Sequence, residues 1–233
     1  MTAVAERRGG VASEHLAQQI AHHADLARRL KDALPDIEAL GQAICASLAA
    51  GGRVIAFGNG GSAAEAEHLA AELVGRARRE RAPLAAIALT ETATVTAIAN
   101  DFGFAEVFAR QVSGKATPGD VVIGISTSGR SENVLRGLAA AREAGAVTAL
   151  LTGAGAGRPP GVDHVVAVPT DSTARVQELH LVIVHLLCEI VDACAIDASA
   201  EPQRRARSAS AAAPTSPARS PSSPRRTSRS RVN

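Results

Sequence analysis

The sequence predicts an α/β domain with a five-stranded parallel sheet flanked by helices, and a pair of helices in front of it. From residue 53 onward, short apolar runs alternate with segments of helical periodicity, which is typical of a parallel sheet covered on both faces. Two of these runs end in turns rich in Gly and Ser that each open a helix. The chain has 233 residues, of which 46% are hydrophobic, so it is long enough for one compact domain with appendages.

The N-terminal part is predicted to form two amphipathic helices, at residues 14–33 and 36–50, after a flexible stretch at residues 1–13. Both segments place Leu and Ile residues at helical spacing. A Leu-Pro-Asp sequence separates the two helices, and a Gly-Gly pair ends the second. Helices that are more apolar than one sheet face requires often pack on a partner subunit, so we expect an oligomer.

The α/β part is predicted to hold five strands, and the domain with its N-terminal helices to span residues 14–197. Such strands are joined by right-handed crossovers, and ligands bind at their carboxyl ends where the strand order reverses. Both Gly/Ser turns follow expected strands and therefore lie at such ends. The expected strands are residues 53–57, 84–89, 120–125, 147–151 and 164–168, and the expected helices are residues 63–78, 91–99, 131–144 and 174–195.

Residues 198–233 differ in composition from the rest and are predicted to be a disordered tail of Arg, Ser, Pro and Ala. The last 33 residues hold eight Arg and one acid, so the net charge of +2 conceals a body with a net charge of about −5. We therefore expect no nucleic-acid-binding face on the body. The basic tail is either an electrostatic anchor for nucleic acid or acidic partners, or a translated extension of GC-rich DNA.

The composition indicates how a sugar would be recognised, whether the cysteines are reduced and where in the cell the protein is located. The chain has no Trp, no Tyr and four Phe, so a sugar would be read by polar groups rather than by stacking on aromatic rings. Its three Cys residues, Cys45, Cys188 and Cys194, have no metal-site spacing, and we expect them to be reduced core thiols. No apolar stretch reaches the length of a membrane span, and no export signal is recognised, so the expected location is the cytoplasm.

The two Gly/Ser turns predict a binding site for a phosphorylated small molecule. The first turn runs from Gly58 to Ser62, and the second from Ser126 to Ser131. Turns of this kind present backbone N–H groups, hydroxyls and a helix N-terminus together, which is how proteins hold phosphate without a dedicated cation. The second turn offers four hydroxyls, those of Ser126, Thr127, Ser128 and Ser131, which is more than chain reversal requires.

Two other interpretations of the turns remain open. The first turn also satisfies the G-x-G-x-x-A form of a dinucleotide fingerprint, but no acid follows at a strand end at the expected distance of roughly 20 residues. Alternatively, both turns only reverse the chain.

Four polar side chains on two predicted helices are candidates for the chemistry. His68 and Glu72 are four residues apart on the helix that the first turn opens, so they share a face. Gln177 and His185 lie on the last helix, and their spacing of eight residues corresponds to about two turns and 80° of rotation. Both can therefore face one cleft, with His180 between them.

Five separated motifs, which occur in consistent order between about residues 14 and 195, resemble the sedoheptulose 7-phosphate isomerase (phosphoheptose isomerase) family of sugar isomerase (SIS) domain proteins. The resemblance implies a flavodoxin-like SIS domain that interconverts sedoheptulose 7-phosphate and D-glycero-D-manno-heptose 7-phosphate. The motifs are Gly58-Asn59-Gly60-Gly61-Ser62, His68 to Arg76, Ala99 to Phe104, Ile125 to Gly129, and Arg175 to His180 with His185.

The resemblance also implies roles for individual residues. An aldose–ketose shift moves a proton between C1 and C2 through a cis-enediol, and by similarity Glu72 is the base and His185 the partner acid. A zinc ion, one per subunit, is implied at His68, Glu72, Gln177 and His185. The implied substrate contacts are Asn59, Gly60, Gly61, Glu72, Asn100, Asp101 and Gln177 toward the sugar, and Ser126, Thr127, Ser128 and Ser131 toward the phosphate.

The resemblance further implies a homotetramer, and it leaves two alternatives to the heptose isomerase. One is the branch of the same fold that bridges copies of a replication initiator without catalysis, whose members lack the Glu and the final His that this chain keeps as Glu72 and His185. The other is an isomerase or sensor for another sugar phosphate. One departure from some relatives is Ala174, which stands where they have Asp three residues before the glutamine.

Overall fold

The sheet has five parallel strands, as the sequence predicts, and their order is β2-β1-β3-β4-β5. The computed structural model describes the backbone of residues 2–211 and the side chains of residues 13–194. The order reverses between β1 and β3, because the chain passes from β1 outward to β2 and then returns to the other side of β1. The strands are β1 (Val54–Gly58), β2 (Ala86–Ala88), β3 (Val121–Ser126), β4 (Val147–Thr152) and β5 (His164–Ala167).

The central strands are buried on both faces, which is why they are apolar without a polar alternation. Successive side chains of β1 enter two different cores: Val54 and Ala56 pack in one, Ile55 and Phe57 in the other. In the second core the ring of Phe57 stacks on that of Phe108, with centroids 4.7 Å apart. The sheet therefore separates two apolar layers.

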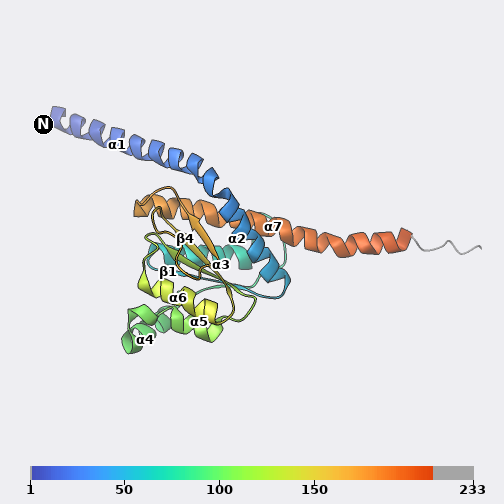
Figure 1. Cartoon of the computed structure of the whole chain (residues 1–233). Helices are drawn as coiled ribbons and strands as arrows, with labels where there is room; N and C mark the ends of the chain where they lie inside the picture. The colour runs from blue at the N-terminus through green and yellow to red at the C-terminus, as the bar shows by residue number, and fades with distance from the viewer. Residues whose placement is uncertain (1, 212–233) are drawn as a thin grey trace, which may run out of the picture. The chain divides into compact units, whose positions relative to one another are not determined.

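Helices cover both faces of the sheet (Figure 1). The first core is closed by α2 (Leu34–Ala49), α3 (Gly61–Val74) and the first part of α7 (Thr173–Ala211). The second is closed by α4 (Thr92–Phe102), α5 (Ala109–Lys115) and α6 (Glu132–Glu143). The helix α5 and the short 3-10 turn η2 (Phe104–Glu106) were not predicted, because segments of seven and three residues are too short for a clear helical period.

The N-terminal helical pair is present, with different limits from those predicted. Helix α1 spans Thr2–Arg29, and a 3-10 turn, η1 (Leu30–Ala33), joins it to α2. Among the described side chains of α1, Leu26 is 1% exposed and packs in the first core, whereas Leu16 and Ile20 are 61% and 71% exposed. The apolar stripe of α1 thus extends beyond the part that packs in this core.

The boundary between the domain and the C-terminal tail, expected at residues 197 and 198, remains a prediction. Helix α7 continues to Ala211, past the expected helix end at residue 195, and residues 212–233 of the predicted tail lie outside the described residues. The contacts divide the chain at Asp197 into two units, and only the first contains the sheet. None of the described helices is both long and apolar enough to span a membrane.

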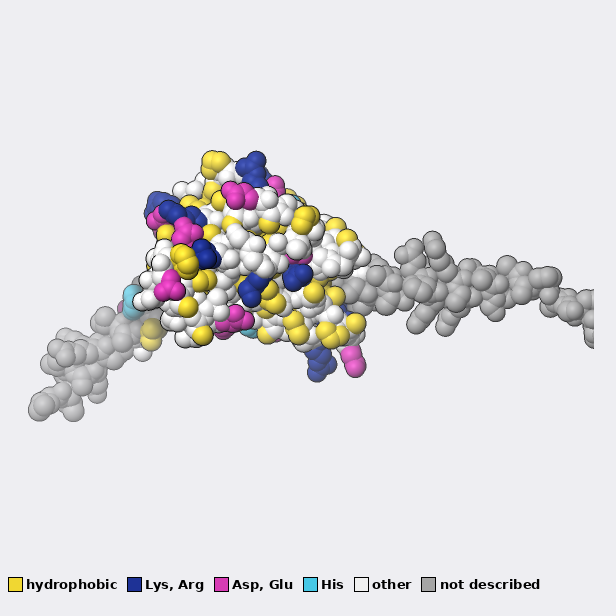
Figure 2. Space-filling view, turned by 90° about the horizontal axis from the view of Figure 1, so that it is seen from below, with side chains coloured by type: hydrophobic (Ala, Val, Ile, Leu, Met, Phe, Trp, Pro, Cys, Tyr) yellow, Lys and Arg dark blue, Asp and Glu magenta, His cyan; other side chains and the backbone are white. Residues whose placement is uncertain are grey.

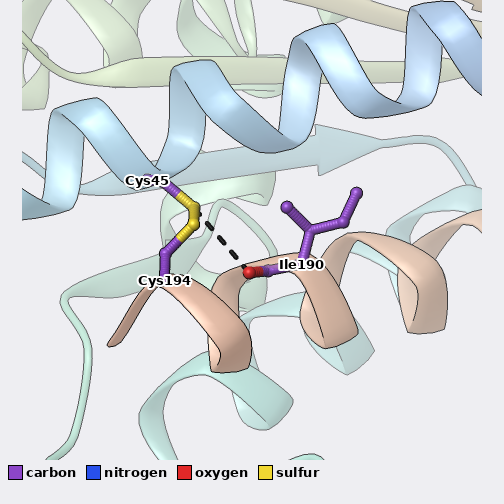
Figure 3. Close-up of a disulfide and its surroundings, with 3 residues drawn as sticks. All are labelled: Cys45, Ile190 and Cys194. Atoms are coloured by element: carbon purple, nitrogen blue, oxygen red, sulfur yellow. Dashed lines mark hydrogen bonds between the residues drawn. A yellow bond between two sulfur atoms is a disulfide. The ribbon is translucent and has the colours of Figure 1, made fainter. Parts of the chain in front are cut away.

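The expectation of three reduced cysteines is wrong for two of them. Cys45 on α2 and Cys194 on α7 form a disulfide, which Figure 3 shows between the two helices. Helix packing brings their Cα atoms to 6.2 Å, within the range that a disulfide needs, although 149 positions separate them in the sequence. Cys188 is free and buried, and burial raises the pKa of its thiol to about 12.

Charges of both signs share the surface of the domain. On the face shown in Figure 2, Lys and Arg side chains alternate with Asp and Glu, and apolar side chains lie among them. Several of these charges are paired: Arg136, for example, contacts both Glu132 and Glu106, and these hydrogen bonds raise its pKa.

Candidate functional site

The two Gly/Ser turns lie next to each other at the carboxyl edge of the sheet. Gly58 at the end of β1 is paired with Ile125 near the end of β3, so the turns that follow leave the sheet from adjacent strands. This is the point where the strand order reverses, as predicted for a ligand site in such a sheet.

The first turn brings α3 close to α7. Gly60 has φ +57°, a left-handed conformation that favours glycine, and α3 begins at Gly61. A Cβ atom placed on Gly61 would lie 2.2 Å from Nε2 of Gln177. The absence of a side chain at Gly61 therefore lets the Gln177 amide lie directly against the start of α3.

The second turn is a compact cluster of hydroxyls. The Oγ atoms of Ser126 and Ser131 are hydrogen-bonded at 2.9 Å, and the Ser128 Oγ accepts the N–H of Arg130 at 3.2 Å. Gly129 turns the chain with φ +63°. Beside the turn is a cavity of about 90 Å³. It is lined by Thr127, Ser128, Arg130, Ala154, Gly155, Asp171 and Thr173.

A pair of amides connects the two turns. The Nδ2 of Asn59 donates to Oδ1 of Asn133 at 2.9 Å, and the Nδ2 of Asn133 donates back to Oδ1 of Asn59 at 2.8 Å. Asn133 is 4% exposed and lies in the first turn of α6, just after the hydroxyl cluster. The separation between the first turn and the second is therefore fixed by two reciprocal hydrogen bonds.

Three of the four predicted chemical groups converge at one place. Nε2 of His68 lies 3.0 Å from Nε2 of His185 and 3.5 Å from Oε1 of Glu72. The His68 and Glu72 side chains are 37% and 25% exposed, and His185 is exposed, so the group is open to solutes. Gln177, the fourth, lies on α7 about two turns before His185, and its side chain lies against Gly61. Helices α3 and α7 thus carry the candidate groups, as the sequence predicts.

The spacing of these atoms suits a metal ion. Two ligands at 2.0–2.1 Å from a tetrahedral zinc ion lie about 3.3 Å apart, between the 3.0 and 3.5 Å measured here. One ligand atom from each of His68, Glu72 and His185 lies within 4.8 Å of the others. The same 3.0 Å separation also fits a direct hydrogen bond in which one imidazole donates to the other.

Asn100 and Asp101 lie apart from this cluster. Both belong to the end of α4, which packs against the core on the other side of the sheet from α3 (Figure 1). Asn100 Nδ2 donates to Asp101 Oδ1 at 2.8 Å, and Asp101 lines a separate cavity between α4 and α5. Their contact with a sugar stays a prediction.

Sequence reasoning missed the buried polar residues that join α3 to α7. Arg81 and Asp192 form an ion pair at 2.7 Å, and Glu65 lies 3.4 Å from His180. Burial alone would raise the pKa of Asp192, but hydrogen bonds from Arg81 and from the amides of Arg78 and Arg79 outweigh it, and the pKa is lowered. Partners more than one hundred residues apart give no local pattern that could have revealed them.

Comparison with known proteins identifies the family. Residues 12–153 match the family model for the SIS domain. A phosphoheptose isomerase from Paramagnetospirillum magneticum is 51% identical over 186 residues, which cover 78% of this chain and 97% of that protein. Two solved structures of phosphoheptose isomerases superpose on 78% of this chain: that from Neisseria gonorrhoeae (38% identity, 99% of its chain, TM-score 0.72) and that from Francisella tularensis (34%, 98%, 0.74). The chain therefore belongs to the phosphoheptose isomerase family of SIS-domain proteins.

Proposed function

We propose that this isomerase interconverts sedoheptulose 7-phosphate and D-glycero-D-manno-heptose 7-phosphate. The observation that carries the proposal is the convergence of Glu72 and His185 from two different helices, in a domain that also presents a turn rich in hydroxyls at the carboxyl edge of its sheet. The relatives named phosphoheptose isomerase, at about half identity over most of the chain, support the same substrate.

The reaction needs one base and one acid on the same edge of the sugar. In the proposed mechanism the Glu72 carboxylate removes the proton from the carbon next to the carbonyl, which gives a cis-enediol. The same proton is then returned to the neighbouring carbon, while His185 exchanges a proton with the oxygens of C1 and C2. Because His68 contacts both groups, it holds the carboxylate and the His185 imidazole on one side of the bound sugar.

The polar turns are proposed to bind the two ends of the substrate. The hydroxyls of Ser126, Thr127, Ser128 and Ser131 and the N-terminus of α6 would hold the phosphate. The first turn, Asn59-Gly60-Gly61, would contact the sugar hydroxyls with its backbone and amide groups. Asn100 and Asp101 are kept as further sugar contacts.

We propose zinc as the metal of the cluster, held by His68, Glu72, Gln177 and His185. Two imidazoles and a carboxylate are ordinary zinc ligands, and their measured spacing fits a tetrahedral ion. When bound, zinc would polarise the oxygens at C1 and C2 of the sugar. A carboxylate that coordinates a metal is not free as a base at that instant, so Glu72 must exchange between the two roles during turnover.

We also propose a homotetramer located in the cytoplasm. The exposed Leu16 and Ile20 of α1 and the exposed Phe102 and Phe104 near α4 supply apolar surface for contacts between subunits. The cytoplasmic location rests on the kinship with enzymes of sugar-phosphate metabolism.

Incubation with sedoheptulose 7-phosphate tests the function directly. The wild-type protein is expected to form the aldose, and Glu72→Gln is expected to fold normally and to lose about 10²–10⁴-fold in rate, because it lacks the base. Aldose formation is followed by chromatography, with and without added zinc. A wild-type protein that forms no aldose under either condition would instead favour the non-catalytic scaffold of the same fold.

A further inference from the structure

We propose that Arg81, held by Asp192, is a positioning residue that fixes the last turn of α3 and thereby the place of the Glu72 carboxylate. The inference rests on the proposed role of Glu72 and extends it to two residues outside the cluster of His68, Glu72 and His185. It starts from the location of Glu72 near a helix end. Helix α3 ends at Val74, so Glu72 lies in its last turn.

The last turn of a helix is its least secured part, because its carbonyls lack partners within the helix. Arg81 supplies partners for two of these carbonyls. Its Nη1 donates to the carbonyl oxygen of Leu73 at 2.8 Å, and its Nη2 donates to that of Glu72 at 2.9 Å. A guanidinium at this place also carries the charge that the negative end of the helix dipole favours. One side chain thus holds the backbone of Glu72 itself.

Asp192 fixes the guanidinium from the other helix. Arg81 Nε donates to Asp192 Oδ1 at 2.7 Å, and the Arg81 and Asp192 side chains are 5% and 4% exposed. The other oxygen of Asp192 accepts the amides of Arg78 and Arg79, both at 3.3 Å. The carboxylate therefore binds both the side chain and the chain segment that follows α3.

The Arg81–Asp192 pair connects α3, which carries Glu72, with α7, which carries His185. Asp192 lies on α7, seven residues or about two turns after His185. Arg81 consequently links the backbone at Glu72 with the helix that presents His185. Removing one partner of a buried ion pair is destabilising, because the other charge is left without a partner. The guanidinium of Arg81 donates in several directions at once, which the single ammonium group of a lysine cannot fully replace.

The matched control is a second buried aspartate, whose hydrogen-bond partners belong to neither α3 nor α7. Asp120 is 1% exposed, accepts the backbone N–H groups of Arg53 and Thr117 at 3.0 and 2.9 Å, and lies 3.6 Å from Nε of Arg53. It directly precedes β3, and its ion-pair partner Arg53 directly precedes β1, so the pair joins two strands rather than two helices. Asp120→Asn and Asp192→Asn therefore remove the same charge from similar surroundings.

The test measures backbone exchange, catalysis and metal affinity in the full-length protein. Asp192→Asn and Arg81→Met are expected to speed hydrogen exchange at the end of α3, including the Gly75 amide that donates to Ala71 at 2.8 Å. They are also expected to lower kcat by about 10- to 100-fold with KM within about threefold, since a misplaced base affects the chemical step. Arg81→Lys should recover part of kcat. Asp120→Asn should leave all three readouts near wild type, even where it lowers the melting temperature equally.

The outcomes separate this inference from the proposed function. Unchanged exchange at the end of α3, or faster exchange with an unchanged kcat, overturns the positioning role. A wild-type protein without isomerase activity refutes the proposed function, and the inference is then decided by the zinc dissociation constant. A tenfold or larger increase of that constant in Asp192→Asn, but not in Asp120→Asn, supports the positioning role. Equal constants, or a wild-type protein that binds no zinc, overturn it.

Discussion

The substitution Gly61→Ala tests whether the position of the Gln177 amide matters for the site. A Cβ atom at Gly61 would lie 2.2 Å from Nε2 and 2.9 Å from Cδ of Gln177, whereas ordinary contacts begin at 3.4 Å. The amide of Gln177 must therefore move by about 1.2 Å in Gly61→Ala. The backbone need not move, because the atoms in the way belong to the end of a flexible side chain.

We expect Gly61→Ala to change the catalytic rate and zinc binding rather than the stability of the fold. Alanine is favoured over glycine within a helix by up to about 1 kcal/mol, so the free energy of unfolding should change little. A displacement of about 1 Å in a catalytic site can lower the rate about 100-fold, which corresponds to about 2.7 kcal/mol. We therefore expect a loss of about 10- to 100-fold in kcat and weaker zinc binding.

Three measurements decide the prediction: a thermal melt, the kcat for sedoheptulose 7-phosphate, and the zinc dissociation constant from competition with a chelator. Gly114→Ala in α5 is the matched control, because a Cβ there meets nothing within 4 Å, and it should leave all site properties unchanged. If Gly61→Ala keeps the wild-type kcat and zinc affinity, Gln177 has no role at the cluster and the ligand set is wrong.

Three further predictions concern the phosphate turn, the disulfide and acid stability. Ser128→Ala should raise KM severalfold with little change in kcat, because it weakens ground-state binding of the phosphate; an unchanged KM would place the phosphate elsewhere. Cys45→Ser, or a reductant, should lower the free energy of unfolding by up to about 5 kcal/mol for a loop of this length, and melts of Cys188→Ser should keep their response to the reductant. Burial raises the pKa of Asp163, but hydrogen bonds from the Thr148 amide and hydroxyl outweigh it and lower the pKa below 3.8. The stability that Asp163 contributes is thus present above pH 3.8 and lost as the pH falls through the lowered value, so Asp163→Asn should flatten this part of the acid unfolding curve.

The sequence predicts the sheet well because its central strands are buried on both faces. The segments at β1 and β3 are continuous apolar runs, each followed by a glycine or serine turn, and no other element gives that pattern in so few residues. The edge strand β2 is less well predicted: it has three residues where six were expected, since an edge strand has only one neighbour to pair with.

The site could be predicted in part, because some of its residues are linked by local spacing. His68 and Glu72 share a face of one helix, so their proximity follows from the helical period. The disulfide between Cys45 and Cys194 and the ion pair between Arg81 and Asp192 depend on how helices far apart in the chain pack together. No propensity or periodicity encodes such partners, and only the three-dimensional structure reveals them.

The amide pair Asn59–Asn133 has a consequence for which sugars the enzyme accepts. Because the pair joins the two turns by two hydrogen bonds, the hydroxyl cluster and the first turn keep one separation. These turns are the proposed contacts for the phosphate and for the sugar hydroxyls, so a phosphorylated sugar has to match that separation to reach both.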